Sequence, residues 1–380
     1  MKYKPNLPSV NDMQNRARKR IPRFAWEYLS SGISAEHGLQ RNRTDLDEIQ
    51  LWPKYLTDVG KVDTSCELFS KRYDLGLGVS PVGLSNMMWP TAECQLAKAA
   101  QQANIPYTLS TMGTTRLEEI AECAPDVAWF QLYVPQDREV MKDLINRVKL
   151  AGYKVLVITV DIPVGAKRDK ELKNGLILPF KYTPRIIAQT LCCPKWLIKT
   201  LKQGIPRFVN LEPYGDLNNV NHLSEFLTQF FMTGVTIKRI QEIRELWDGP
   251  LVVKGLLRSN DIQQCMDVGI DGVVVSNHGG RQLDGAPSSV EAMRQLSDNV
   301  KSELTILMDS GVRTGLDVVR CKALGADAAF TGRSFLFAMA GAGDDGGRQV
   351  IEIFRDEITR TLQQIGCTKF DAINDTWMQS

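Results

Sequence analysis

Two side chains with catalytic chemistry stand close together in the segment SNHGGRQLDG, residues 276–285. His278 follows a run of valines and is one of three histidines in the chain, and Arg281 lies three positions further on. Imidazole can exchange a proton near neutral pH, and a guanidinium can bind a carboxylate through two parallel hydrogen bonds. A histidine at the end of a strand can equally serve packing. The elements around it must therefore decide between the two interpretations.

Short apolar segments alternate with amphipathic helical patterns, such as residues 138–152 and 236–247, from about residue 75 onward. The apolar segments are nearly uninterrupted, as in a parallel sheet that is buried on both faces. Eight of them predict an α/β fold, a (β/α)8 TIM barrel, rather than an open sheet, whose first strand is normally followed by GxGxxG and not by SPVGLSN. The strands are expected at 75–83, 105–111, 127–134, 155–161, 251–255, 272–279, 304–311 and 328–333.

The whole chain, residues 1–380, is expected to form one domain, with two segments outside the barrel pattern. Residues 1–70 are an N-terminal extension, in which a helix is predicted around residues 11–32. Residues 165–233 follow the fourth strand and are too long for a structureless loop. We therefore expect this long loop to carry helices or a function of its own.

The composition argues against several classes of protein. With 43% hydrophobic and 24% charged residues the chain can bury a large core, and a net charge of +2 gives no indication of a nucleic-acid partner. We find no signal peptide and no apolar run of about 18 residues, and expect a cytoplasmic protein. No metal-ligand spacing is found, so neither a metal site nor a disulfide is expected among the eight cysteines: Cys66, Cys94, Cys123, Cys192, Cys193, Cys265, Cys321 and Cys367.

Polar residues gather at the predicted carboxyl ends of the strands, which form the active-site face of such a barrel. Each of these residues taken singly could serve packing or a loop hydrogen bond, but their number on one face favours an active site. Lys254 could pair with a carboxylate or stand beside a group that becomes anionic, and Arg168 could be a solvated charge or join Arg281 in a carboxylate clamp. The strand-end residues are Gly83, Ser110, Gln131, Tyr133, Thr159, Asp161, Lys254, Ser276, His278, Arg281, Asp309, Arg313, Gly332 and Arg333.

The last two strands end in DSGVRTG and FTGRS, which both combine glycine with arginine. Glycine lets backbone amides approach phosphate oxygens, and arginine adds a bidentate cation where barrels commonly bind phosphate. Two glycine turns with surface arginines would be the alternative. Because two neighbouring strands repeat the pattern, we favour a phosphate-bearing cofactor or substrate.

Together these segments resemble the FMN-dependent L-2-hydroxy acid dehydrogenase and oxidase family. Six motifs occur in order: WFQLYV, TVDIP, LVVKG, SNHGGRQLD, DSGVRTG and ALGADAAFTGR. The likeness extends from RIPRFAWEYLSSG near the start to LQQIGC near the end. It implies the oxidation of a lactate- or mandelate-like L-2-hydroxy acid to the 2-oxo acid, with FMN as cofactor, and a homotetramer.

The resemblance also implies roles for single residues. His278 would be the catalytic base, oriented by Asp161, and Tyr133 would hydrogen-bond the substrate oxygen. Lys254 would stabilise negative charge on the reduced flavin. The substrate-binding residues would be Tyr28, Met112, Arg168 and Arg281. The cofactor-binding residues would be Pro81, Val82, Gly83, Ser110, Gln131, Thr159, Lys254, Ser276, Asp309, Gly311, Arg313, Gly332 and Arg333.

Three features bear on the pocket and on the electron acceptor. Gly83 stands where many oxidases of the family have alanine, which favours a dehydrogenase, and Met112 stands where a tryptophan is usual, which implies a different side-chain pocket. Residues 176–211 are basic, aliphatic and aromatic without an acidic residue, as in segments that lie on an anionic membrane. Packing helices or a lid are the alternatives. The aromatic residues considered for the membrane are Phe180, Trp196 and Phe208.

We therefore expect electrons to pass to a quinone or similar acceptor, with peripheral contact with the cytoplasmic face of the inner membrane. Three rivals stay open. An oxidase of the same family would reduce O2 to H2O2. An FMN-dependent isomerase would perform no net redox chemistry and would not need Arg281, and a flavin-binding protein would have lost catalysis. The particular hydroxy acid is left open.

Overall fold

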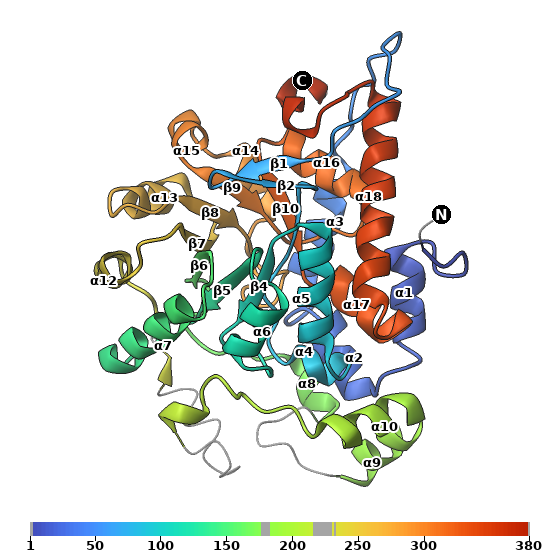
Figure 1. The fold of residues 1–380 in the computed structure, drawn as a ribbon, viewed down its shortest axis with the longest axis vertical. Helices are drawn as coiled ribbons and strands as arrows, with labels where there is room; N and C mark the ends of the chain where they lie inside the picture. Colours follow the sequence, from blue (N-terminus) through green and yellow to red (C-terminus); the bar gives the residue numbers. More distant parts are fainter. Residues whose placement is uncertain (1–2, 176–182, 216–229, 232, 379–380) are drawn as a thin grey trace.

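Eight parallel strands close into a barrel in the order β10-β3-β4-β5-β6-β7-β8-β9. The computed structural model describes residues 3–175, 183–215, 230–231 and 233–378, and its helices surround the barrel (Figure 1). The predicted TIM barrel is confirmed, and each strand overlaps its predicted range. The strands are β3 (Leu77–Val79), β4 (Tyr107–Ser110), β5 (Ala128–Leu132), β6 (Val155–Thr159), β7 (Leu251–Leu256), β8 (Gly272–Val275), β9 (Thr305–Met308) and β10 (Ala328–Thr331).

Some of the helices that follow the strands begin at side chains that cap them. Asp137 caps α7 (Arg138–Leu150), the helix predicted over residues 138–152. Thr314 forms a reciprocal capping box with Asp317 at the start of α16 (Gly315–Ala323). The larger barrel helices are α5 (Ala92–Ala103), α7 (Arg138–Leu150), α12 (Ile237–Leu246), α13 (Ser259–Met266), α16 (Gly315–Ala323), α17 (Arg333–Ala342) and α18 (Gly346–Ile365). Shorter ones are α4 (Ser85–Met88), α6 (Leu117–Cys123), α14 (Ser289–Arg294), α15 (Asp298–Glu303), η2 (Phe370–Ala372) and η3 (Asp375–Trp377).

In the N-terminal extension, two helices take the place of the single helix that was predicted around residues 11–32. The first, α1 (Val10–Ala17), ends before Pro22, and α2 (Arg23–Ser30) begins directly after it. Proline has no N–H for the helix ladder and disfavours a helical conformation of the preceding residue, so it separates the two. The extension continues with α3 (His37–Asp47) and the hairpin of β1 (Cys66–Leu68) and β2 (Lys71–Tyr73).

The long loop after β6 contains helices of its own. They are α8 (Asp169–Lys173), α9 (Pro184–Leu191), α10 (Pro194–Gln203) and η1 (Glu212–Tyr214), and the first three lie together beside α2 and α4 (Figure 1). Residues 176–182 and 216–229, with Phe180 among them, lie outside the described residues. Within the described part of the chain, no helix has the length and apolar character needed to cross a bilayer.

Two of the three aromatic residues considered for the membrane, Trp196 and Phe208, are buried and do not face outward. Trp196 is 5% exposed, donates a hydrogen bond from Nε1 to the Met87 carbonyl oxygen at 2.9 Å, and packs edge-on against Phe24. Phe208 is equally buried. A tryptophan gains more from a packed surface with a partner for its N–H, which α2 and α4 supply here. The outward-facing apolar residues of α9, α10 and the turn after them are instead Ile187, Leu191, Ile198, Leu201 and Ile205.

A partly buried carboxyl group on α18 makes the stability of the scaffold depend on pH. Burial raises the pKa of Glu357 to about 7, and this outweighs the hydrogen bond from Gly315 N at 2.6 Å, which lowers it. An unfolded chain ionises the same group with a pKa of about 4.3. The folded state therefore loses stability relative to the unfolded state as pH rises from about 4 to 7.

We predict that Glu357→Gln stabilises the protein, and more so at pH 8 than at pH 5. Glutamine keeps an acceptor for Gly315 and never carries the charge, so the difference between the two gains should be about 1–2 kcal/mol after screening. Urea unfolding at both pH values measures it. Glu352→Gln on the same helix, where the carboxylate pairs with Arg355 at 3.7 Å, is the control. Equal gains at both pH values would contradict the assignment.

Candidate active site

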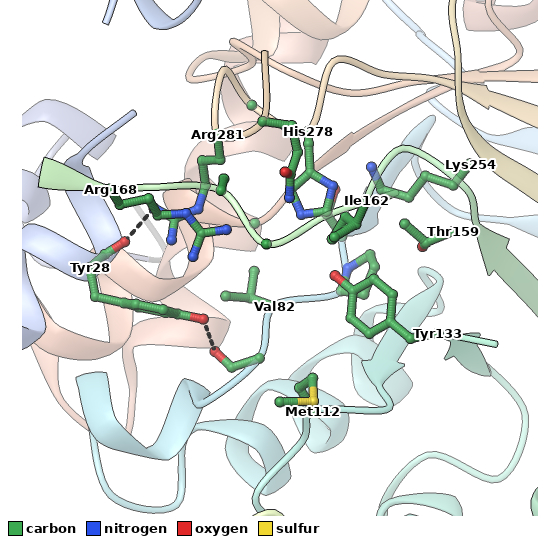
Figure 2. A pocket seen from close by; sticks show the side chains of 18 of the residues that line it. Tyr28, Val82, Met112, Tyr133, Thr159, Ile162, Arg168, Lys254, His278 and Arg281 are labelled. Atoms are coloured by element: carbon green, nitrogen blue, oxygen red, sulfur yellow. Dashed lines mark hydrogen bonds between the residues drawn. The ribbon is translucent and has the colours of Figure 1, made fainter. Parts of the chain in front are cut away.

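One cavity of about 720 Å³ lies at the carboxyl ends of the barrel strands and collects most of the predicted site residues (Figure 2). The alternative that each serves packing alone does not explain this convergence. The predicted residues that line the cavity are Tyr28, Pro81, Val82, Gly83, Met112, Tyr133, Thr159, Arg168, Lys254, His278, Arg281, Asp309, Gly311, Arg313, Gly332 and Arg333. Four other predicted residues, Ser110, Gln131, Asp161 and Ser276, do not line the cavity.

His278 and Asp161 form a hydrogen-bonded pair at the cavity. The Nδ1 atom of the imidazole lies 2.9 Å from Oδ1 of the carboxylate. Burial raises the pKa of Asp161, but the adjacent His278 and, to a smaller extent, Lys254 lower it by more. The pKa is therefore below its usual value, and the carboxyl group stays ionised. An ionised carboxylate holds the proton of the imidazole on Nδ1 and leaves Nε2 as the free basic nitrogen. The geometry therefore leaves one ring nitrogen able to accept a proton.

The backbone around His278 is built to hold this arrangement. His278 has a left-handed backbone conformation, with φ 57°, and its N–H donates to Ser276 Oγ at 3.0 Å. Such a conformation is uncommon for a residue other than glycine and persists where the surroundings impose it. Gly255 leaves room for Asp161, the hydrogen-bond partner of His278, because a Cβ atom at residue 255 would lie 2.5 Å from the Asp161 Cγ atom. The loop therefore fixes the ring and its carboxylate together.

Lys254 is both buried and paired. Its Nζ atom lies 3.0 Å from Asp309 Oδ2 and donates to Ser276 Oγ at 2.6 Å. The sequence left open whether this cation pairs with a carboxylate or faces the cavity, and the structure shows that it does both. Asp309 is in turn held by Ser310, whose hydroxyl also accepts from the N–H of Gly279. The lysine is thereby connected to the loop that carries His278.

Arg168 and Arg281 lie side by side at the cavity (Figure 2). The Arg281 guanidinium donates from Nη1 to the carbonyl oxygens of Tyr28 at 2.7 Å and Ser31 at 3.0 Å, and it stacks over the Tyr28 ring at 4.8 Å. These carbonyls belong to the end of α2, where helix carbonyls lack partners in the helix and attract cations. Arg168 is 22% exposed, so it is not the freely solvated loop charge of the alternative interpretation.

The two arginines of the proposed phosphate site differ. Arg333 donates to three backbone carbonyl oxygens, those of Leu29, Ser31 and Gly279, at 2.9–3.0 Å, and so joins α2 to the loop of His278. Burial lowers the pKa of Arg313 to about 10, with a smaller effect of Arg43 in the same direction. A bound anion would offset this desolvation. Both arginines are part of the cavity wall and neither is a surface group.

Several residues of the cavity were not identified from the sequence. Apolar side chains between the loop and the barrel form one wall, and a carboxylate, Glu171, contacts both clamp arginines. The carboxylate follows Arg168 by three positions in a short helix, a spacing that brings side chains together and could have indicated it. The apolar wall has no such signal, because its members come from distant segments: Ile162, Val164, Leu172, Phe208, Phe231 and Val235.

The chain matches the family described as FMN-dependent dehydrogenase over residues 17–380 and belongs to that family. It is therefore an FMN-dependent oxidoreductase. Among its relatives, an L-lactate dehydrogenase of Haemophilus influenzae (strain PittEE) is 39% identical over 354 residues, which cover 93% of each chain. An L-lactate dehydrogenase of Acinetobacter baylyi (strain ATCC 33305 / BD413 / ADP1) is 37% identical over 97% of each chain.

Solved structures agree with this assignment. An (S)-mandelate dehydrogenase described as a monotopic membrane protein superposes with a TM-score of 0.93 at 32% identity, covering 98% of this chain and 99% of that one. A mandelate oxidase gives a TM-score of 0.80 at 32% identity, covering 96% and 97% of the two chains. The resemblance stated from the six motifs is confirmed at the level of family and fold.

Two unpaired polar groups at the carboxyl ends of β5 and β6 suit FMN. Gln131 Nε2 and Thr159 Oγ1 are buried without a hydrogen-bond partner among the described residues, and a buried donor or acceptor without a partner is unfavourable. Gln131 is fixed by Ser110, whose hydroxyl donates to its Oε1 at 2.9 Å. A flavin ring offers donors and acceptors for such groups, and Arg313 suits its phosphate. The residues present therefore fit the cofactor of the family.

Proposed function

We propose that this protein oxidises an L-2-hydroxy acid to the 2-oxo acid, with His278 as the base and a quinone-type electron acceptor. The observation that carries the proposal is one cavity lined by His278, Arg168 and Arg281, with Asp161 hydrogen-bonded to the histidine. When bound, FMN supplies a two-electron acceptor. A carboxylate held by the arginines would place the adjacent hydroxyl-bearing carbon next to the imidazole.

The roles of the other residues follow from their surroundings. Nε2 of His278 takes the proton that leaves the substrate, and Asp161 stabilises the resulting imidazolium. Burial raises the pKa of Tyr133 above its usual value, so its hydroxyl stays protonated and can donate to the substrate oxygen. Lys254, held by Asp309, places a positive charge where reduction creates negative charge. Neither an isomerase nor an inactive flavin-binding protein would need this complete set.

The substrate side chain would occupy the apolar wall of the cavity. Met112 and Val82 line it, and a Cβ atom on Gly83 would lie 2.9 Å from the Met112 Cβ atom. The glycine therefore keeps space that an alanine would fill. A flexible methionine in this wall admits side chains of several shapes. Lactate-like and mandelate-like acids both stay candidates.

Anaerobic mixing of the FMN-loaded protein with a panel of L-2-hydroxy acids tests the proposal. We expect one acid to bleach the flavin absorbance, with fast recovery on addition of a quinone and slow recovery in air. Rapid recovery in air would identify an oxidase that forms H2O2. No bleaching by any acid, with flavin bound, would favour the isomerase or the inactive binding protein.

The acceptor proposal is supported by the apolar face of the long loop. Ile187 and Leu191 of α9 and Ile198 and Leu201 of α10 are 48–74% exposed and share the segment with Lys195, Lys202 and Arg185. Exposed apolar side chains with a basic surround are typical of helices that lie in the interface of an anionic bilayer. Peripheral contact with the cytoplasmic face of the inner membrane would bring the cavity near a membrane quinone. Whether the chain forms a homotetramer is a separate proposal, based on the family resemblance.

We predict that Leu191→Glu combined with Leu201→Glu lowers binding to phosphatidylglycerol-rich vesicles by at least about tenfold, since two apolar groups are lost and two anions gained. Co-sedimentation with vesicles measures the bound fraction. Leu150→Glu on α7 is the matched control, because that leucine is 80% exposed outside the long loop. Equal losses in both variants, or no vesicle binding by the parent protein, would count against this surface.

A further inference from the structure

A third charged residue stands between the two arginines of the proposed clamp. Glu171 is 7% exposed, and its Oε1 atom accepts a hydrogen bond from Arg281 Nη2 at 2.8 Å. Its Oε2 atom lies 3.6 Å from Arg168 Nη1. One carboxylate therefore bridges both guanidinium groups inside the cavity wall.

The neighbours of Arg281 leave few of its donors for a ligand. A guanidinium has five N–H groups. Nη1 uses two for the carbonyl oxygens of Tyr28 and Ser31, and Nη2 uses one for Glu171. The two that stay free of a partner in the described structure are on Nη2 and Nε. Because Nη1 and Nη2 are both held, the direction of the free donors is fixed by α2 on one side and by Glu171 on the other.

Arg168 adds a further free donor to the two of Arg281. Its Nε atom is buried without a hydrogen-bond partner among the described residues. The residue is the N-cap of α8, and Glu171 lies one turn further along this short helix. Glu171 thus connects the helix that carries Arg168 to the arginine that α2 holds in place.

The negative charge of Glu171 also offsets the repulsion between the two arginines. Burial lowers the pKa of Arg281, the nearby Arg168 lowers it further, and Glu171 acts in the opposite direction. Two guanidinium groups without a counterion would repel each other in this partly desolvated place. With Glu171 between them the pair carries a net charge of +1, which one substrate carboxylate neutralises.

We propose that Glu171 is a positioning residue of the carboxylate clamp: it holds Arg281 and Arg168 together and directs their free donors toward a single substrate carboxylate. This inference rests on the proposed function for the identity of the ligand. Glu171 does not contact the reacting atoms, so its removal acts on affinity for the acid more than on the rate of the bound complex.

The test compares Glu171→Gln with Glu171→Asp in the FMN-loaded protein. Glutamine removes the charge and turns an N–H group toward one arginine, whereas aspartate keeps the charge on a side chain shorter by one methylene. For Glu171→Gln we expect the dissociation constants of pyruvate and phenylglyoxylate, measured by calorimetry, to rise about 10- to 50-fold. KM for the hydroxy acid should rise similarly, with kcat within about threefold. Aspartate should recover most of the affinity.

Asp169→Asn is the matched control on the same helix. It removes the same charge two residues away, where the carboxylate lies 3.7 Å from Lys167 and is 46% exposed. We expect its affinities within about twofold of those of the parent protein, because exposed ion pairs contribute little. Thermal unfolding of all variants shows whether any of them is merely less stable, a change that a purely structural role would produce without altering the dissociation constants.

Two results would overturn the proposal. Unchanged affinity in Glu171→Gln would show that the clamp does not need the carboxylate. Tighter binding would show that Glu171 competes with the ligand for the arginines. Failure of the proposed function looks different, because the parent protein would then not be bleached by any hydroxy acid, while the titrations with the two 2-oxo acids would still report on the clamp.

Discussion

Replacing His278 with asparagine is expected to lower kcat by about 10⁴-fold while FMN stays bound. A positioned general base contributes about 10²–10⁴-fold, and asparagine cannot take up a proton. Asparagine is the suitable replacement because it tolerates the left-handed conformation, φ 57°, that His278 adopts. The loop should therefore keep its path, and the loss should report on chemistry rather than on folding.

Stopped-flow measurement of flavin bleaching by the hydroxy acid checks this expectation, and the visible flavin spectrum checks cofactor content. His37→Asn is the matched control, since it makes the same substitution at the start of α3, a helix that contributes no residue to the cavity lining. A kcat within tenfold of the parent value would mean that another group removes the proton. Loss of FMN from the variant would mean that the loop had lost its structure.

The barrel and most of its strand-end residues could be predicted because both are local properties of the sequence. Strands such as β8 are apolar at every position, which is required when helices cover one face and the barrel interior lies behind the other. Polar residues at or just beyond the carboxyl ends of such strands fall on one face of the barrel, whatever the conformation of the loops. His278, Arg281 and Lys254 could thus be assigned to a common site before any contact was known.

The direction in which a side chain faces, and the residues that it contacts, could not be predicted in the same way. The pattern of α10 contains Trp196, Ile198 and Leu201, and only the docking of α2 decides that the tryptophan faces inward and the other two outward. Likewise Arg333 was expected at a strand end, where it lies, but its three carbonyl partners come from α2 and from the loop of His278. Such contacts join segments about 50 to 300 residues apart and leave no local periodicity.

The break between α1 and α2 is a different case, because its signal was in the sequence. Pro22 stands within the range predicted as one helix, and proline normally ends or kinks a helix at the preceding residue. The separate α2 ends at Ser30, and two carbonyl oxygens of its last turn accept hydrogen bonds from Arg281 and Arg333.

Arg281→Lys is expected to lower kcat/KM by about 10²–10³-fold although the positive charge is retained. Lysine has one compact ammonium group on a flexible stem and cannot bond the two α2 carbonyl oxygens and Glu171 while presenting a fork to a carboxylate. Truncation or misplacement of a buried, hydrogen-bonded charge typically costs about 2–5 kcal/mol, or roughly 30- to 5,000-fold, and the expected loss lies within this span. Loss of the bonds to Tyr28 and Ser31 should also lower the free energy of unfolding by about 1–2 kcal/mol.

Steady-state kinetics and urea unfolding of Arg281→Lys separate these effects, with Arg258→Lys, an exposed arginine outside the cavity lining, as control. If Arg281 only held the substrate, KM would rise and kcat would not change. We expect kcat to fall as well, because the arginine also sets the angle at which the hydroxyl-bearing carbon meets His278, and small misplacements of reacting atoms are costly. A kcat/KM within threefold of the parent value would remove Arg281 from the clamp and leave it as the cap of α2.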